Sequence, residues 1–235
     1  MDMQSKKSSI IKAIKQTVDL KIEDFVAWKI AKDTNDPFKV LIATILSQNT
    51  TDKAAILAFY DLEKGIGVDP WKLKNTNLDK ISKLIRVAGL HFTKAKAIRK
   101  LSQIVIEKFG GDIKRVLTKD LETARKELTA LPRVGKKTAD VLLLMLANKP
   151  VLPVDTHISR VALRLGISDR KDYDSVQSSL MEILENENLL EAHLYLIAFG
   201  RKICKARKPL CSKCPLNSIC KYYKSRESYT KHETK

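Results

Sequence analysis

Hydrophobic residues recur along this chain at helical spacing, and strictly alternating segments are scarce. Pro37 and Thr51 are suited to helix starts. Helices are therefore expected over a series of segments in the first half of the chain: 8–19, 37–46, 53–62, a segment after 77–79 and a segment after Thr93. The apolar stripe of the fourth segment is expected to consist of Ile81, Leu84, Ile85 and Val87. Short helices joined by brief connections indicate an all-α fold without a sheet.

Charge indicates the kind of partner. The 235 residues include 44 Lys and Arg against 27 Asp and Glu, a formal net charge of +17. A chain this basic is expected to bind a polyanion or an anionic membrane. The longest apolar run, Val141–Ala147, is far shorter than the roughly 20 residues of a membrane helix, and no apolar signal segment follows the first residues. We expect an intracellular protein, cytoplasmic or nucleoid-associated, with nucleic acid as its partner and no membrane contact.

The cysteines are clustered near the end of the chain. They have the spacing C-x6-C-x2-C-x5-C and are Cys204, Cys211, Cys214 and Cys220. Two disulfides in one short stretch would do little for the rest of an intracellular chain. Four thiolates around one centre are the better interpretation, and both Zn²⁺ and an iron–sulfur cluster accept four cysteines. The spacing alone leaves both metals open.

The segment Leu131–Asp140, with the sequence LPRVGKKTAD, predicts a tight hairpin between two helices. Pro132 cannot continue a helix, and a new helix can begin after Gly135, where the backbone must turn or approach another group closely. The first N–H groups of that helix form a site for an anion such as a phosphate. The segment is not a nucleotide-binding P-loop, because Ala130 and Lys137 stand where that motif needs Gly and Ser or Thr.

Lys136 and Lys137 occupy the first turn of that helix, where the helix dipole disfavours cations. A cationic neighbour and a positive helix end both lower the pKa of an ammonium group. An amine with a lowered pKa is a usable nucleophile toward a sugar C1′ or an aldehyde carbon. The alternative is that both lysines only contact phosphate, and the local pattern does not separate the two interpretations.

Asp155 precedes an apolar-periodic run that ends at Leu165, a pattern typical of a helix N-cap. An aspartate that faces a lysine across a groove can also stabilise cationic charge developing on a sugar, or assist proton transfer. His157 is the one histidine beside these motifs, and we expect a structural role for it.

The order of these motifs along the chain is typical of one protein family. The hairpin Leu131–Thr138, the sequence VDTH at 154–157 and the cysteine pattern together resemble the endonuclease III family, helix–hairpin–helix glycosylases of DNA base excision repair. The resemblance runs from about Phe38 to Cys220, which is most of the chain.

The resemblance implies two helical domains that flank a DNA groove. A helical barrel with the helix–hairpin–helix is expected over residues 31–145. Residues 1–30 plus 146–220 are expected to form an iron–sulfur cluster domain. Residues 221–235 are expected to be a basic, flexible tail.

The family also implies the chemistry. Lys137 matches the catalytic lysine and Asp155 the catalytic aspartate of a bifunctional DNA glycosylase and abasic-site (AP) lyase for oxidised pyrimidines. The damaged base would be flipped out of the duplex, and Lys137 would displace it at C1′ to form a Schiff base. β-Elimination would then cut the strand on the 3′ side. The four cysteines would hold a [4Fe–4S] cluster rather than zinc.

Other residues resemble family contacts to duplex DNA with damaged bases or abasic sites. Asn49, with Gln48 beside it, stands where the family usually has a Gln that fills the gap left by the flipped base. Leu90 matches an apolar wedge, although its own properties equally suit the core. Backbone contacts are expected from the hairpin and the first cluster loop: Arg133, Gly135, Lys136, Lys205, Arg207 and Lys208. Arg133 departs from the family, which commonly has Gly there.

Two other functions stay open. A monofunctional uracil or thymine mismatch glycosylase would share the fold without needing the amine of Lys137. A non-catalytic DNA-binding module, with a metal site made of the four cysteines, would bind DNA and show no activity. Because repair of a single lesion requires no symmetry, we expect a monomer.

Overall fold

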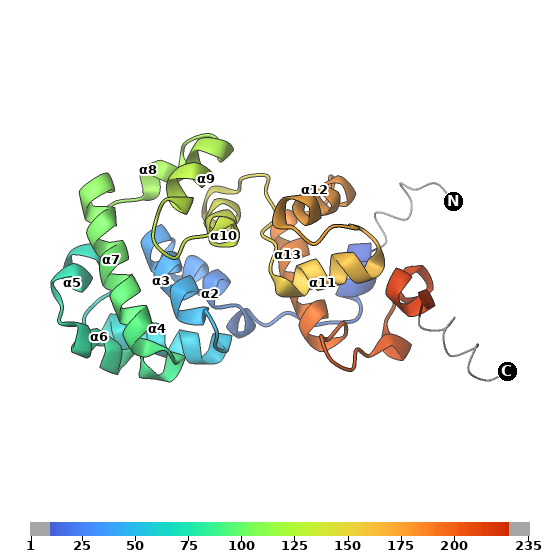
Figure 1. Ribbon diagram of the computed structural model, residues 1–235, viewed down its shortest axis with the longest axis horizontal. Coiled ribbons are helices and arrows are strands. Elements are labelled where there is room, and N and C mark those ends of the chain that lie inside the picture. The colour runs from blue at the N-terminus through green and yellow to red at the C-terminus, as the bar shows by residue number, and fades with distance from the viewer. Residues whose placement is uncertain (1–9, 226–235) are drawn as a thin grey trace. The chain divides into compact units, whose positions relative to one another are not determined.

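The computed structural model describes residues 10–225, in which every regular element is a helix and no strand occurs. This confirms the expected all-α fold (Figure 1). The chain divides into two compact units, residues 21–149 and residues 1–20 together with 150–235. No helix within the described part of the chain is long and apolar enough to span a bilayer.

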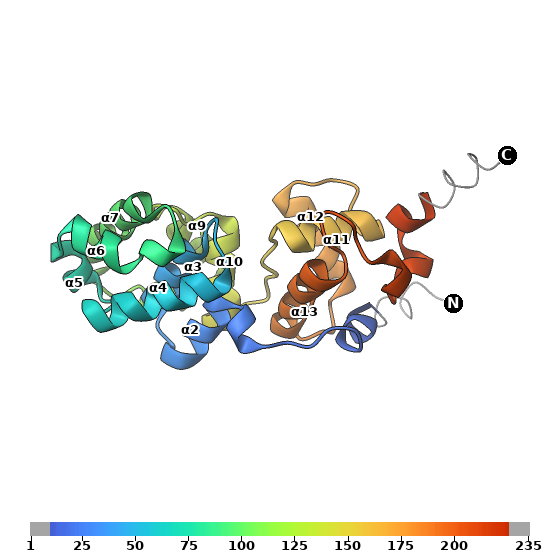
Figure 2. The same cartoon turned by 90° about the horizontal axis from the view of Figure 1, so that it is seen from below.

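The unit of residues 21–149 is built from nine α-helices and two short 3-10 helices. In chain order they are η1 (Ile22–Asp24), α2 (Val26–Thr34), α3 (Pro37–Ser47), α4 (Asp52–Gly65), α5 (Pro70–Asn75), α6 (Leu78–Leu84), η2 (Arg86–Ala88), α7 (His91–Phe109), α8 (Lys114–Leu117), α9 (Leu121–Thr129) and α10 (Lys136–Ala147). The long helix α7 packs along α5 and α6, as Figures 1 and 2 show.

Helix α3 forms the core of this unit and packs against α2, α4, α7 and α10. Nine of its eleven residues are buried, which accounts for the nearly continuous apolar run. Burying each Leu or Ile side chain stabilises the fold by about 1.5–3 kcal/mol. The helix begins as predicted: Pro37 occupies the first turn, and the Asp36 carboxylate accepts hydrogen bonds from the first free backbone N–H groups.

The predicted elements differ from the structure around η2. The apolar stripe is correct for Ile81 and Ile85, but it is wrong for Val87, which is 48% exposed. Helix α6 ends at Leu84, so the helical period that predicted burial of Val87 no longer applies. The next helix, α7, begins two residues before Thr93.

The other unit surrounds α13 and has a helical segment at residues 10–15. Its remaining elements are α11 (Thr156–Leu165), α12 (Tyr173–Ile183), α13 (Leu189–Lys202), η3 (Cys211–Lys213) and η4 (Asn217–Ile219). Helix α13 packs against α11. Gly200 permits this close approach, since a Cβ there would lie 2.9 Å from the Cβ of His157. The N-terminal segment is tied to α13 by an ion pair between Lys15 and Glu191, 2.7 Å from Nζ to Oε2.

The unit boundaries lie apart from the expected ones. Residues 21–30, which the sequence assigned to the cluster domain, belong to the unit of residues 21–149. The reason is that η1 packs on α2 and α4, and α2 packs on α3. Of the expected tail, residues 221–225 are helical, and the rest lies outside the described residues.

Candidate active site

The predicted hairpin joins α9 to α10 over residues 130–135. Leu131 and Val134 are buried and anchor the turn, while Gly135 is the N-cap of α10 and contributes no side-chain cap. A Cβ at Gly135 would meet no other atom within 4 Å. Crowding inside the protein therefore does not explain the glycine, and the open space in front of α10 suits the approach of a group from outside.

A buried ion pair holds the two helices of the hairpin together. Arg125 on α9 donates to Asp140 on α10 through Nε at 2.8 Å and Nη2 at 3.3 Å. Asp140 is fully buried, so its charge needs this guanidinium. Lys137 lies less than one turn from Asp140, and its side chain is half-buried. The local sequence does not predict this pair, because a charged residue in an amphipathic helix is usually solvated.

Left-handed backbone marks several of the predicted DNA contacts. Six non-glycine residues within 10–225 have φ between 48° and 65°: Asn35, Asn49, Leu90, Arg133, Asn148 and Lys208. Asn35 and Asn148 are C-caps of α2 and α10, where Asn is common. The other four are all residues expected to contact DNA. Such backbone costs about 1–2 kcal/mol per residue and concentrates at functional sites, so the coincidence supports their assignment.

The gap-filling segment lies against the hairpin. Gln48 is the C-cap of α3, and its Nε2 donates a long hydrogen bond of 3.4 Å to the carbonyl of Arg133. Asn49 is exposed beside it. Leu90 is 59% exposed at the start of α7, which excludes the core interpretation. One unit thus carries these three residues together with the hairpin and Lys137.

Asp155 is the N-cap of α11, and its Oδ1 accepts a hydrogen bond of 2.8 Å from the backbone N–H of Ile158. The segment before it is fixed from two helices. Gln177 of α12 donates to the carbonyl of Leu152 at 2.7 Å, and His193 of α13 donates to the carbonyl of Pro153 at 3.0 Å. Lys137 and Asp155 belong to different units, so their pairing across a groove stays a prediction.

His157 is half-buried on α11. Its Nδ1 lies 3.1 Å from Nη2 of Arg160 and accepts a hydrogen bond, because a guanidinium can only donate. Burial is the main cause that lowers the pKa of His157, and the charges of Arg201 and Arg160 lower it further, against the opposing effect of Asp155. A neutral, hydrogen-bonded imidazole packed against Gly200 supports the expected structural role.

All four cysteines line one cavity: Cys204, Cys211, Cys214 and Cys220. Four cysteines are the donor set that an iron–sulfur cluster takes, and one cavity brings all four together.

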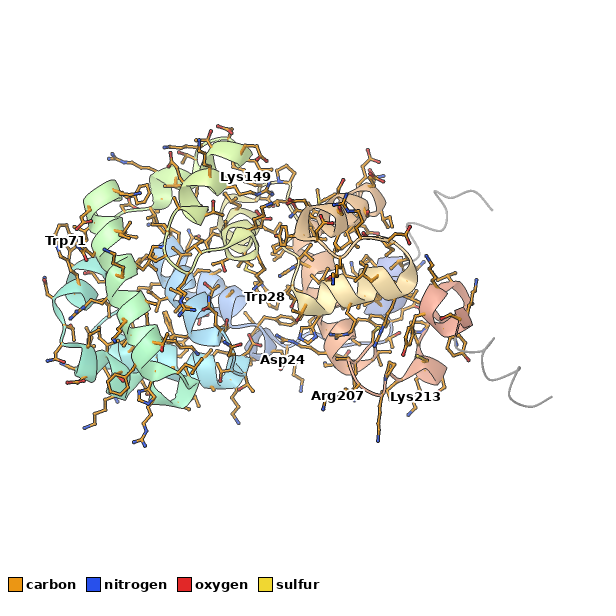
Figure 3. All side chains as sticks on the ribbon, in the orientation of Figure 1. Asp24, Trp28, Trp71, Lys149, Arg207 and Lys213 are labelled. Atoms are coloured by element: carbon orange, nitrogen blue, oxygen red, sulfur yellow. The ribbon has the colours of Figure 1, made fainter. Side chains whose placement is uncertain are left out.

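Two arginines of α11 hold the first cluster loop. Arg160 Nε donates to the carbonyl of Cys204 at 2.9 Å. Arg164 donates through Nη1 to the carbonyl of Lys205 at 2.7 Å and to the Sγ of Cys204 at 3.4 Å. The side chains of the loop cations remain exposed: Lys205, Arg207 and Lys208. Figure 3 shows Arg207 on the outer edge of this loop. No sequence motif marks either Arg160 or Arg164.

Comparison with known proteins identifies the family. Residues 42–186 match the HhH-GPD superfamily of base excision DNA repair proteins, and residues 204–220 match the iron–sulfur binding domain of endonuclease III. Endonuclease III of Sulfolobus acidocaldarius is 38% identical over 86% of this chain and 89% of its own length. The corresponding protein of Thermotoga maritima is 35% identical over 81% of this chain and 85% of its own.

Solved structures with a similar fold agree with this family assignment. A trapped covalent intermediate of endonuclease III with DNA has a TM-score of 0.78 and 32% identity, covering 97% of this chain and all of that one. A thermostable thymine-DNA glycosylase has the same fold, with a TM-score of 0.77, 24% identity, and coverage of 95% of this chain and all of that one. The chain therefore belongs to the endonuclease III family within the HhH-GPD superfamily of base excision DNA repair proteins.

Proposed function

We propose that this chain is a bifunctional DNA glycosylase and AP lyase that removes oxidised pyrimidines from duplex DNA, with Lys137 as the nucleophile and Asp155 as its catalytic partner. The observation that carries the proposal is the position of Lys137. It lies in the first turn of α10, directly behind the Gly135 turn, with its side chain half-buried. The monofunctional alternative does not need an amine at this position.

The reaction follows from amine chemistry. The neutral Lys137 amine attacks C1′ of the flipped nucleotide, the glycosidic bond breaks, and the base leaves with a proton. The bond between C1′ and the ring oxygen then breaks, the ring oxygen takes a proton, and a protonated imine forms between C1′ and Nζ. A base removes the C2′ proton, and the 3′ C–O bond breaks with its electrons on the phosphate. Water then hydrolyses the imine and frees the enzyme. Asp155 stabilises the cationic sugar or moves a proton.

Backbone phosphates are bound from two places. In the hairpin, Arg133, Gly135 and Lys136 present a cationic turn and the N-terminus of α10. In the first cluster loop, exposed side chains supply three further cations: Lys205, Arg207 and Lys208. Each phosphate neutralised contributes about −0.9 to the slope of log Kobs against log salt. These contacts position the enzyme on duplex DNA without reading its sequence.

Opening of the duplex is assigned to three residues of the same unit as Lys137. Asn49, with Gln48 beside it, fills the space of the flipped base, and Leu90 enters the stack as an apolar wedge. The exposure of Leu90 and the left-handed backbone of Leu90 and Asn49 support this assignment. Asn49 is shorter than Gln by one methylene, which is expected to alter the preference for the opposite base.

The chain carries a [4Fe–4S] cluster. We assign its ligands as Cys204, Cys211, Cys214 and Cys220, which line one cavity. When bound, the cluster supplies four Fe–S bonds that hold the loop of Lys205–Lys208 in place. The chain's own residues Arg160 and Arg164 anchor the same loop through its carbonyl groups.

We further propose that the enzyme acts as a monomer in the cytoplasm, associated with the nucleoid.

Borohydride trapping tests the function. The substrate is a duplex with one oxidised pyrimidine. The variants are Lys137→Ala and, as the control, Lys126→Ala, which removes an exposed lysine of α9 that has no assigned role. We expect a covalent adduct with wild type and Lys126→Ala, and none with Lys137→Ala. Base release without an adduct, revealed by alkali, would instead identify a monofunctional glycosylase.

A further inference from the structure

Lys94 is a buried lysine that the proposed reaction does not use. It lies in the first turn of α7 and is 4% exposed. Its Nζ donates to two backbone carbonyl oxygens, those of Leu46 at 2.8 Å and Ala88 at 2.7 Å. No carboxylate among the described residues pairs with it. Burial lowers the pKa of Lys94, and its amine nitrogen has enough N–H groups to donate to both carbonyls.

The two carbonyls come from separate segments that both lead to a predicted DNA contact. Leu46 lies in the last turn of α3, two residues before Gln48. Ala88 ends η2, two residues before Leu90. The segments are about 40 residues apart in the sequence, and Lys94 connects them through a single nitrogen atom.

Neither carbonyl has another described partner. At the end of α3, the N–H of Gln48 bonds to the carbonyl of Ile45, and the N–H of Thr50 bonds to that of Ser47. Neither of these N–H groups bonds to the carbonyl of Leu46. Both Leu46 and Ala88 are fully buried, and a buried carbonyl without a donor is costly. Lys94 thus satisfies two backbone groups that would otherwise be unpaired.

Lys94 also fixes the wedge segment from its own backbone. Its N–H bonds to the carbonyl of Leu90 at 2.9 Å, so the first turn of α7 holds this segment at two points, Ala88 and Leu90. The conformation it fixes is strained, because Leu90 has φ of 48°. A strained turn persists only where its surroundings determine it.

We propose that Lys94 is a positioning residue that joins the gap-filling segment to the wedge segment, so that Asn49 and Leu90 enter the duplex as one rigid unit. The inference rests on the proposed function, in which these residues open the duplex. Lys94 does not touch the reacting atoms. It should therefore matter where a base must be flipped out of a stack, and not where the sugar is already accessible.

The test compares two rates for the same full-length holoenzyme. One is base excision from a duplex with a single oxidised pyrimidine. The other is cleavage of a single-stranded oligonucleotide that carries a preformed abasic site, where there is no stack to open. We expect Lys94→Met to lower the ratio of duplex excision to single-strand cleavage about 10-fold to 100-fold, since small misplacements have effects of this order.

Val105→Ala is the matched control, because Val105 is buried on the same helix α7 but far from both segments. It should lower the melting temperature while leaving the ratio unchanged. If Lys94→Met does not fold, Lys94→Gln gives the test, since its amide is one bond shorter and cannot reach both carbonyls. The ratio should fall here too.

An unchanged ratio in the folded variant, whether the two rates stay the same or fall equally, would overturn the role of Lys94. A wild-type enzyme that neither cleaves the single-stranded abasic site nor forms a borohydride adduct would overturn the proposed function instead. The two failures are therefore distinguishable.

Discussion

Arg133 offers a test in which folding stability and DNA affinity change in opposite directions. Its φ of 65° is left-handed, a backbone conformation that suits the glycine common in the family, and its side chain is exposed. We predict that Arg133→Gly stabilises the fold and weakens DNA binding. Arg133→Ala is the matched control, because it removes the same charge but keeps the Cβ that causes the strain.

The size of the effect follows from two opposing terms. Relief of left-handed strain is worth about 1–2 kcal/mol, and the greater freedom of glycine in the unfolded chain costs about 0.5–1 kcal/mol. The expected net gain is about 0.5–1 kcal/mol, or about 2 °C in melting temperature for a chain of this length. Loss of one phosphate contact should make the slope of log Kobs against log salt shallower by about 0.9.

Thermal unfolding by far-ultraviolet circular dichroism measures the first effect, and fluorescence anisotropy of labelled duplex DNA at several salt concentrations measures the second. Both variants should show the shallower slope, but only Arg133→Gly should melt above wild type. A glycine variant that melts at or below wild type would refute the strain argument. An unchanged slope in both variants would refute the phosphate contact.

Three further predictions concern other parts of the molecule. Arg125→Met leaves the buried Asp140 carboxylate without its guanidinium and should cost about 3–5 kcal/mol in urea unfolding; an unchanged midpoint would contradict this. Burial lowers the pKa of His157 in the folded chain below its ordinary 6.5. At pH values between this lowered pKa and 6.5, the unfolded chain binds more protons, so the stability of the fold falls as the pH drops. His157→Gln should flatten this fall in melting temperature, and curves parallel to wild type would count against the argument. Cys214→Ser should lose iron and visible absorbance, whereas full iron content would exclude Cys214 as a ligand.

The features that could be predicted are those written into local sequence. Pro132 and Gly135 fix where α9 ends and α10 begins, and Asp155 starts α11 as its N-cap. The cysteine spacing likewise indicated four ligands around one centre. Each of these signals lies within one short stretch of the chain, where backbone geometry leaves few alternatives.

The features that were missed depend on packing between distant segments. Lys94 and Lys96 look equivalent in the sequence, yet Lys94 is buried against two carbonyls and Lys96 is exposed. Arg160 resembles a solvated cation of an amphipathic helix but holds the cluster loop. Leu90 suits a core by its own properties, so only the family resemblance indicated a wedge, and the structure leaves it 59% exposed. No periodicity encodes these contacts, because they arise only when the helices pack.

Peptide mapping of the borohydride-trapped adduct tests the central claim most directly. The wild-type holoenzyme is trapped on duplex DNA with one oxidised pyrimidine, digested, and analysed by mass spectrometry for the lysine that carries the sugar remnant. The account predicts the remnant on Lys137 alone. A remnant on Lys136, or on any other amine of the chain, would contradict the assignment of Lys137 as the nucleophile.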